Sequence, residues 1–299
     1  MFNSIQRCKD LFQKLGYKTI LLDGILWIGY QKMIVPVGPV SDKYEVISAE
    51  QKNDLLRFFK ECALIRTGMG FIDMPDAWYV IICDQPHTLL DLSANTRSNV
   101  RRGLRDCIIR KIDAKFMAEH AWTVFSSGFE QYKNDWLKVS EEKFRKNMAL
   151  TDGFDDIIHY WGVFDKQNNE FIAYAQNYLY DKTEVNYSIM RLNPNARRRY
   201  ASHILYYEMN RYYLNEEKFT YTNAGFRSLL HDTNIQEHLT SKFIFKKQPV
   251  DLKIYYRPFI GRCVSLTYPY RHLLGKIYRP LAALYKLEEM NRSGYRTKC

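Results

Sequence analysis

The 299-residue sequence lacks several features that mark common classes of protein. No apolar run approaches the roughly 20 residues that a membrane-spanning helix needs. The opening residues, MFNSIQRCKDLFQKLGYK, contain no hydrophobic core of a secretory signal. The six cysteines are scattered without a close pair at zinc-ligand spacing, and the seven histidines form no metal-binding pattern. We therefore expect reduced thiols, a cytoplasmic location and no bound metal.

Acidic residues are scarce relative to basic ones. The formal net charge is +11 and the pI is about 9.2. This surplus of positive charge indicates an anionic partner. The partner is a phosphate-rich cofactor, RNA or an acidic membrane surface, and the net charge does not distinguish these three. Hydrophobic residues make up 46% of the chain, which is enough for a substantial core and two domains or lobes.

The N-terminal part predicts a small α/β lobe. We expect a short helix over residues 1–18, strands within Thr19–Val40, a helix over Ser48–Ile65 and a buried strand over Trp78–Cys83. Ser48 is a suitable N-cap for the longer helix, because its hydroxyl can accept a hydrogen bond from a free backbone N–H group.

A polar, basic helix is predicted over Leu92–Asp106, with Ser93 as its N-cap. Arg97, Arg101 and Arg105 recur every four residues and share one helix face. Such a stripe repels itself unless an anion lies against it. The pattern leaves two interpretations open, a solvated linker helix or a contact for tRNA or another anionic polymer.

The following segment has an informative order of elements. It predicts a strand, two helices, three strands joined by tight turns, a helix, a strand, a helix and two closing strands. The ranges are Cys107–Ile112, Ala114–Tyr132, Glu141–Leu150, Ile158–Phe164, Phe171–Tyr180, Glu184–Leu192, a helix to Leu214, Phe219–Ala224, Asp232–Lys242 and a strand pair within Ile244–Tyr256.

The turn after Glu184–Leu192 has the local design of a phosphate site. Residues 193–195, Asn-Pro-Asn, end the strand, and three arginines precede the next helix. Backbone N–H groups at a helix start and the helix dipole both attract an anion. The alternative is a strand-to-helix turn with a solvated basic face.

Alternation within Glu184–Leu192 predicts two unlike faces. One face carries Val185, Tyr187 and Ile189, and the other carries Glu184, Asn186, Ser188 and Met190. The first packs on helices. The second is too polar for a core, so it either lines a cleft or remains an exposed sheet face.

The order of elements over residues 107–257 resembles the GNAT acyltransferase fold. Leu192-Asn193-Pro194, the run Arg197–Ser202 and Leu205 follow the frame of that family's turn motif, but both of its glycines are missing. In the family these residues let the backbone approach the acyl-CoA pyrophosphate. Tyr200 stands at the first of these positions and Ser202 at the second, so the resemblance is to a divergent member.

A second signature of that family also survives in part. Leu239, Lys242 and Phe245 keep their places on the helix before the closing strands. The tyrosine that usually acts as general acid is replaced by Thr240, whose hydroxyl pKa is too high for that role.

A narrower resemblance is to Fem-type enzymes, which move an amino acid from aminoacyl-tRNA to a peptidoglycan precursor and carry two GNAT-like lobes. Leu90–Ser93 and Thr96–Arg102 look like the basic helix at the start of their second lobe. Residues 1–92 would then be an N-terminal lobe, a shortened GNAT-like half. Residues 93–260 would be the GNAT-like domain and residues 261–299 a basic helical extension.

The expected fold class is therefore α/β (α+β), with a GNAT-like mixed, mainly antiparallel central sheet flanked by helices, a smaller N-terminal α/β lobe and a helical C-terminal tail. The tail mixes leucines with arginines and lysines. It is either a basic amphipathic helix for a membrane surface or, as we prefer, a helix that packs its apolar face on its own domain.

The resemblance implies an acyltransferase. The donor would be acetyl-CoA or another acyl-CoA, or alternatively aminoacyl-tRNA, and the acceptor a small-molecule or peptide amine. Glu184 is the expected base, and Thr240 marks the position of the acid. The donor-binding residues would be Met190, Leu192, Arg197, Arg198, Arg199, Tyr200, Ala201, Ser202, Asn223 and Asn234. The lost glycines and tyrosine also allow a non-catalytic GNAT-fold protein that binds an anionic polymer or nucleic acid.

Overall fold

The computed structural model describes residues 4–43, 47–74, 78–129, 139–227 and 235–296. By its internal contacts the chain forms two compact units. Unit 1 comprises residues 1–80, 226–236 and 247–299, and unit 2 comprises residues 81–225 and 237–246. Strand β5 (Tyr79–Cys83) and helix α8 (Ile235–Lys242) contribute residues to both units.

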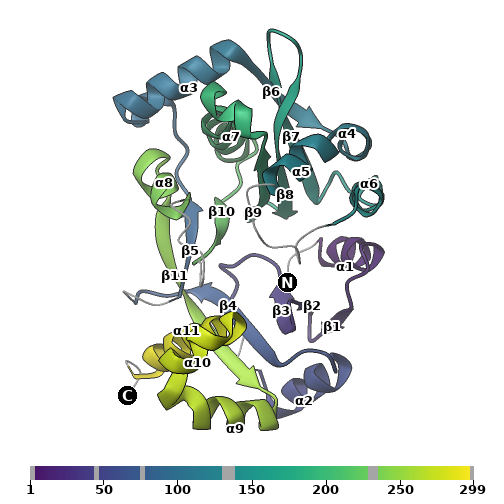
Figure 1. Cartoon of the computed structure of the whole chain (residues 1–299), viewed down its shortest axis with the longest axis vertical. Helices are drawn as coiled ribbons and strands as arrows, with labels where there is room; N and C mark the ends of the chain where they lie inside the picture. Colours follow the sequence, from purple (N-terminus) through teal and green to yellow (C-terminus); the bar gives the residue numbers. More distant parts are fainter. Residues whose placement is uncertain (1–3, 44–46, 75–77, 130–138, 228–234, 297–299) are drawn as a thin grey trace. The chain divides into compact units, whose positions relative to one another are not determined.

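Unit 1 begins with helix α1 (Ile5–Lys14) and an antiparallel meander, as predicted for the N-terminal part (Figure 1). The meander consists of β1 (Thr19–Leu22), β2 (Ile25–Tyr30) and β3 (Met33–Val37). Helix α2 (Ala49–Phe58) then leads to β4 (Leu64–Phe71), which pairs parallel with β3 and antiparallel with β11 (Lys246–Tyr256).

Helix α2 is shorter than the sequence predicts. Its N-terminus carries the predicted cap, because the Ser48 hydroxyl accepts from the Gln51 N–H group and the Gln51 side chain bonds back to Ser48. The helix ends at Phe58, and Arg257 donates to the carbonyl oxygens of Leu56 (2.6 Å) and Phe59 (2.8 Å). The predicted helical residues Leu64 and Ile65 belong instead to β4, because their backbone pairs with β11.

The predicted closing strand pair within Ile244–Tyr256 is also wrong. Residues Lys246–Tyr256 form the single strand β11, which continues through a register shift between Val250 and Asp251 without reversing. Val250 is fully buried. Keeping this side chain in the core requires the backbone to continue through Pro249 without turning back.

Unit 2 contains the predicted antiparallel meander of β7 (Ile158–Asp165), β8 (Phe171–Tyr180) and β9 (Glu184–Leu192). The predicted strand β6 (Cys107–Ile112) pairs antiparallel with β7. Strand β10 (Tyr221–Phe226) then pairs parallel with β9. The mixed, mainly antiparallel sheet with flanking helices is thus confirmed. Both units share one local order of elements. An antiparallel hairpin is followed by a helix and then by a strand that pairs parallel with the second strand of the hairpin.

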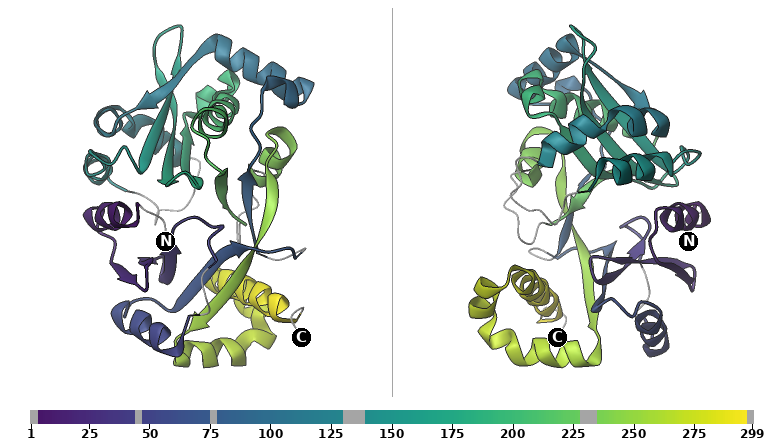
Figure 2. Two further views of the ribbon diagram at one scale, coloured as in Figure 1. Left: turned by 180° about the vertical axis from the view of Figure 1, so that it is seen from behind. Right: turned by 45° about the vertical axis from the view of Figure 1, so that its right-hand side comes forward.

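Helices cover both faces of the unit 2 sheet (Figure 2). Helices α3 (Ala94–Asp106) and α7 (Ala201–Asn210) pack together on one face. The other face carries α4 (Ala114–His120), α5 (Trp122–Phe129) and α6 (Glu141–Ala149). The single helix predicted over Ala114–Tyr132 is therefore two helices with a break at Ala121, and its residues 130–132 lie outside the described part of the chain.

The C-terminal tail is helical, as predicted. It consists of α9 (Pro258–Thr267), the short 3₁₀ turn η5 (Tyr268–Tyr270), α10 (Arg271–Ile277) and α11 (Arg279–Arg296). On α11 the side chains of Tyr285 and Leu287 are buried. Within the ranges that the structure describes, no helix has both the length and the apolar character needed to cross a membrane.

Glycine 103 sets the distance between α3 and α7. A Cβ atom added at Gly103 would lie 2.5 Å from Cγ2 of Ile204, closer than non-bonded carbon atoms approach. Glycine is normally unfavourable inside a helix by roughly 1 kcal/mol, so its presence here reflects this contact. The close approach brings α3 against the start of α7. The segment Pro194–Arg199, which we call the arginine turn, lies directly before this helix.

We expect Gly103→Ala to destabilise unit 2 by about 1–2 kcal/mol, because overpacking outweighs the gain in helix propensity. Chemical denaturation measures this. In an Ile204→Ala background, which removes the contacting methyl group, Gly103→Ala should be neutral or stabilising. Equal destabilisation in both backgrounds would show that the Ile204 contact is not the reason for the glycine.

Candidate active site

The parallel pairing of β9 with β10 ends after three residues. Glu184, Val185 and Asn186 pair with Tyr221, Thr222 and Asn223, and no later pair exists between these two described strands. Residues 187–192 of β9 therefore lie beyond its ladder with β10. We call this stretch, together with Ala224 and Gly225 of β10, the strand opening.

A bulge at Ser188 changes which side chains share a face of β9. Strand β8 pairs Gln176 with Ile189 and Asn177 with Tyr187, which leaves Ser188 without a partner in the ladder. Directly paired residues point to the same side of a sheet. Met190 therefore shares the α7 face with Tyr187, and Ile189 shares the opposite face with Glu184. The strict alternation predicted from the sequence is wrong beyond Ser188.

Glu184 is fully buried in the first pair of this short ladder. Its carboxylate accepts hydrogen bonds from the Tyr221 hydroxyl (2.6 Å) and from the Asn223 side-chain amide (2.9 Å). The side-chain oxygen of Asn223 in turn accepts a hydrogen bond from the Gly225 N–H group (2.8 Å). Two residues predicted to be in the site, Glu184 and Asn223, are thus in direct contact and join β9 to β10.

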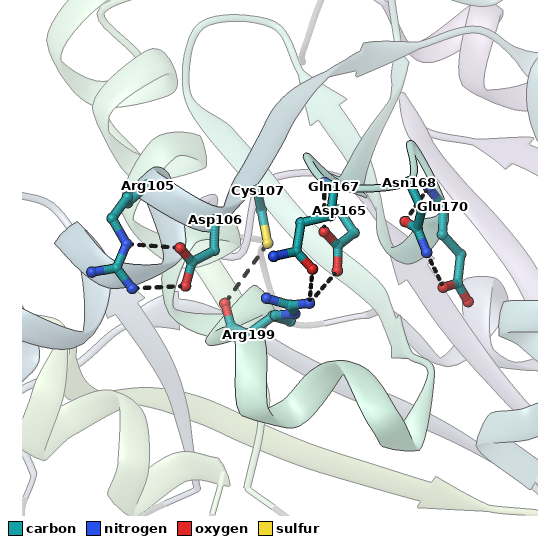
Figure 3. Close-up of polar contacts among 8 residues, drawn as sticks. All are labelled: Arg105, Asp106, Cys107, Asp165, Gln167, Asn168, Glu170 and Arg199. Carbon is teal, nitrogen blue, oxygen red and sulfur yellow. Dashed lines mark hydrogen bonds and ion pairs between the residues drawn. The ribbon is translucent and has the colours of Figure 1, made fainter.

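The arginine turn forms a 3₁₀ segment over Pro194–Arg199. The Arg199 guanidinium binds the Asp165 carboxylate (2.9 Å) and the Gln167 side chain (3.0 Å) at the end of β7 (Figure 3). The Cys107 thiol lies 3.8 Å from the Arg199 carbonyl oxygen. Arg199 therefore anchors the turn to the neighbouring strands β6 and β7.

Tyr200, at the first glycine position of the family motif, adopts the left-handed conformation (φ 55°, ψ 29°). A non-glycine residue is strained there by roughly 1–2 kcal/mol. Its hydroxyl accepts a hydrogen bond from Arg102 of α3 (3.1 Å), and the Arg102 guanidinium lies 5.4 Å from the ring centre. The fold thus requires the backbone conformation that glycine favours, and the side chain contacts α3.

The remaining residues of the turn surround the start of α7. Arg198 is exposed, Ser202 is half-buried and Ala201 is buried. No side chain caps the first turn of α7. The side chain of Arg197 lies outside what the structure describes.

Helix α8 brings a second set of side chains to α7. His203 and His238 are in ring contact, with centres 5.2 Å apart. Burial and the neighbouring His238 lower the pKa of His203 to about 4, so it is neutral at physiological pH. The Thr240 hydroxyl donates to the Glu237 carbonyl oxygen of its own helix (3.3 Å). Asn234 lies outside the described residues.

Sequence reasoning missed a buried polar cluster at the far end of α7. The helix predicted to continue to Leu214 widens into a π-helix over Arg211–Glu216. This places the Tyr213 hydroxyl against His159 (3.0 Å), Trp161 (2.9 Å) and Asn177 (3.2 Å). Burial lowers the pKa of His159 to about 4, so the ring is neutral and can accept a hydrogen bond from the Tyr213 hydroxyl. The sequence signal is the spacing of His159 and Trp161, which stand two residues apart and so share one face of β7.

The arginines of α3 have different environments. Arg105 forms a two-pronged pair with Asp106 (2.7 and 3.1 Å), and Arg97 donates to the Leu90 carbonyl oxygen (3.3 Å). Arg101 is exposed. No cluster of metal-ligating side chains occurs among the residues described, and Cys8, Cys62, Cys83 and Cys107 are buried free thiols.

No protein-family model and no curated protein matches the sequence. Solved structures do match. FemX aligns with a TM-score of 0.56 at 11% identity, over 86% of this chain and 92% of that chain. The chain has a divergent GNAT-like fold with a Fem-like resemblance. L-PGS from Bacillus licheniformis gives a TM-score of 0.52 at 12% identity, over 86% of this chain and 92% of that chain. At these identities the likeness concerns the GNAT-like fold alone.

The left-handed Tyr200 gives a testable reversal of the usual stability order. Alanine normally stabilises a helix relative to glycine by about 1 kcal/mol. At position 200 we expect Tyr200→Gly to be more stable than Tyr200→Ala by about 1 kcal/mol, because only glycine adopts positive φ without strain. Thermal or chemical denaturation compares the two variants. At exposed Ser98 of α3 the normal order should hold, and the same order at position 200 would contradict the assigned backbone conformation.

Proposed function

We propose that this protein is an acyl or aminoacyl transferase that binds an activated acyl donor in the strand opening of unit 2. The observation that carries the proposal is the end of β9–β10 pairing after Asn186, on the strand whose remaining residues lead into the arginine turn and the start of α7. Residues 187–190 of β9, which follow its last ladder pair with β10, would offer backbone hydrogen-bonding groups to an extended donor. The uncapped helix start offers N–H groups to its phosphates.

The donor belongs to one chemical class, an acyl ester or thioester carried on a phosphate-bearing adenosine nucleotide. Acyl-CoA and aminoacyl-tRNA both fit this description. Its phosphates would meet exposed Arg198 and the backbone of Tyr200–Ser202, while Arg199 holds the turn in place through Asp165. Arg197 is proposed for the same contact. The backbone of Met190 and Leu192 would line the reactive carbonyl.

The reaction proposed is attack of an amine on the donor carbonyl, in which a C–N bond forms and the C–S or C–O bond to the carrier breaks. The attacking ammonium must first lose a proton. Glu184 is the proposed acceptor of this proton. The Glu184 carboxylate and its Tyr221 partner are both buried, so the proton would reach Glu184 through an intervening water in the strand opening.

Three other residues are proposed to orient the donor. Asn223, which already binds Glu184, and Asn234 would hold the amide arm of the carrier. Thr240 would donate a hydrogen bond to the leaving group without protonating it, because the pKa of an aliphatic hydroxyl is too high for a general acid.

Calorimetric titration of the purified protein with CoA, acetyl-CoA and uncharged tRNA tests the proposal. We expect binding of at least one carrier and weakening by about tenfold in Arg198→Ala, because a charge-assisted phosphate contact is lost. Arg57→Ala in α2 is the matched control, since that side chain is 78% exposed in unit 1. Binding of tRNA without CoA would select the aminoacyl donor, and binding of neither carrier would overturn the proposal.

Transfer to a panel of primary amines then tests the role of Glu184. Glu184→Gln should lower the rate by about 100-fold or more while donor affinity stays unchanged. If the variant loses donor binding and stability together, Glu184 acts only as a link between the strands. Donor binding without transfer in the wild type would favour the non-catalytic alternative.

A further inference from the structure

Helices α9 and α10 carry a continuous apolar stripe on their outer side. Its residues recur at alternating steps of four and three: Phe259, Cys263, Leu266, Tyr270, Leu273 and Ile277. This spacing places them on one side of a helical segment. All six are exposed, and the five large side chains are 63–76% accessible. We call these six residues the apolar stripe.

The apolar stripe is not the face by which these helices join their own unit. The inner side of α9 places Gly261 against Tyr256, buries Val264 and binds Tyr285 of α11 through the Thr267 hydroxyl (2.8 Å). The inner side of α10 meets α11 where Gly275 lies against Ala282. Both helices are thus already packed, and the exposed stripe is additional to that packing.

The charged residues within the segment that carries the apolar stripe are all basic, and Arg271 of this segment pairs with Glu289 of α11 (3.9 Å). No Asp or Glu occurs from Leu252 to Leu287, whereas lysines and arginines occur throughout that stretch. Arg262, His272 and Lys276 are exposed beside the stripe. Two copies of this surface would repel each other, so the charge disfavours self-association. An anionic surface that accepts apolar side chains fits both the exposed apolar stripe and the basic residues beside it.

We propose that α9 and α10 bind the surface of an anionic membrane, with the apolar stripe inserted at the boundary between headgroups and acyl chains. Phe259, Leu266, Leu273 and Ile277 would bury their side chains, and Tyr270 would lie at the headgroup level, where tyrosine is enriched. Arg262 and Lys276 would bind lipid phosphates. This contact goes beyond the transferase proposal and does not depend on it.

Co-sedimentation with vesicles tests the inference on the full chain. Wild-type protein should sediment with phosphatidylcholine vesicles that contain phosphatidylglycerol, bind phosphatidylcholine alone more weakly, and dissociate as salt rises. The triple variant Leu266→Glu, Leu273→Glu, Ile277→Glu should bind at least about tenfold more weakly. Because all three side chains are exposed, its circular dichroism and thermal midpoint should match the wild type.

Leu90→Glu is the matched control, because Leu90 is 76% exposed but lies in unit 2 away from the stripe in sequence. It should bind vesicles like the wild type. Failure of the wild type to bind anionic vesicles would overturn the inference, as would undiminished binding by a folded triple variant. Self-association measured by ultracentrifugation and lost in the triple variant, without vesicle binding, would instead assign the stripe to a second copy of the chain.

Discussion

The site in unit 2 depends on one buried carboxylate. Glu184 accepts from Tyr221 and Asn223 on the neighbouring strand, and these two contacts span the three residue pairs that join β9 to β10. A buried charge is tolerated only when hydrogen bonds replace its hydration. The two strands are therefore held together at Glu184, and their separation beyond Asn186 begins from a fixed point.

The arginine turn is fixed in a comparable way from outside its own segment. Arg199 reaches Asp165 and Gln167 at the end of β7, and Tyr200 reaches Arg102 on α3. The close contact at Gly103 keeps α3 near enough for the second interaction. The turn has a left-handed backbone of the kind that glycine favours, although the side chain at that position is a tyrosine.

Much of unit 2 could be predicted because its signals are local. Strands β6, β8 and β9 match the predicted ranges. Their apolar residues identify them as strands, and short polar turns such as Asp181-Lys182 mark where they end. The bulge at Ser188 could not be predicted, because an extra strand residue changes no local composition. The Arg199–Asp165 pair joins residues far apart in sequence. Likewise, the π-helical turn around Tyr213 depends on partners in β7 and β8 that helical spacing does not reveal.

The central claim is that the part of β9 beyond its ladder with β10, together with the start of α7, receives the donor. Hydrogen–deuterium exchange, with and without saturating CoA or tRNA, tests it most directly, because backbone N–H groups that gain a hydrogen-bond partner exchange more slowly. The account predicts slower exchange in peptides covering residues 187–192 and 198–205, with β6 as an unaffected reference. Protection elsewhere in the chain, with these two segments unchanged, would contradict it.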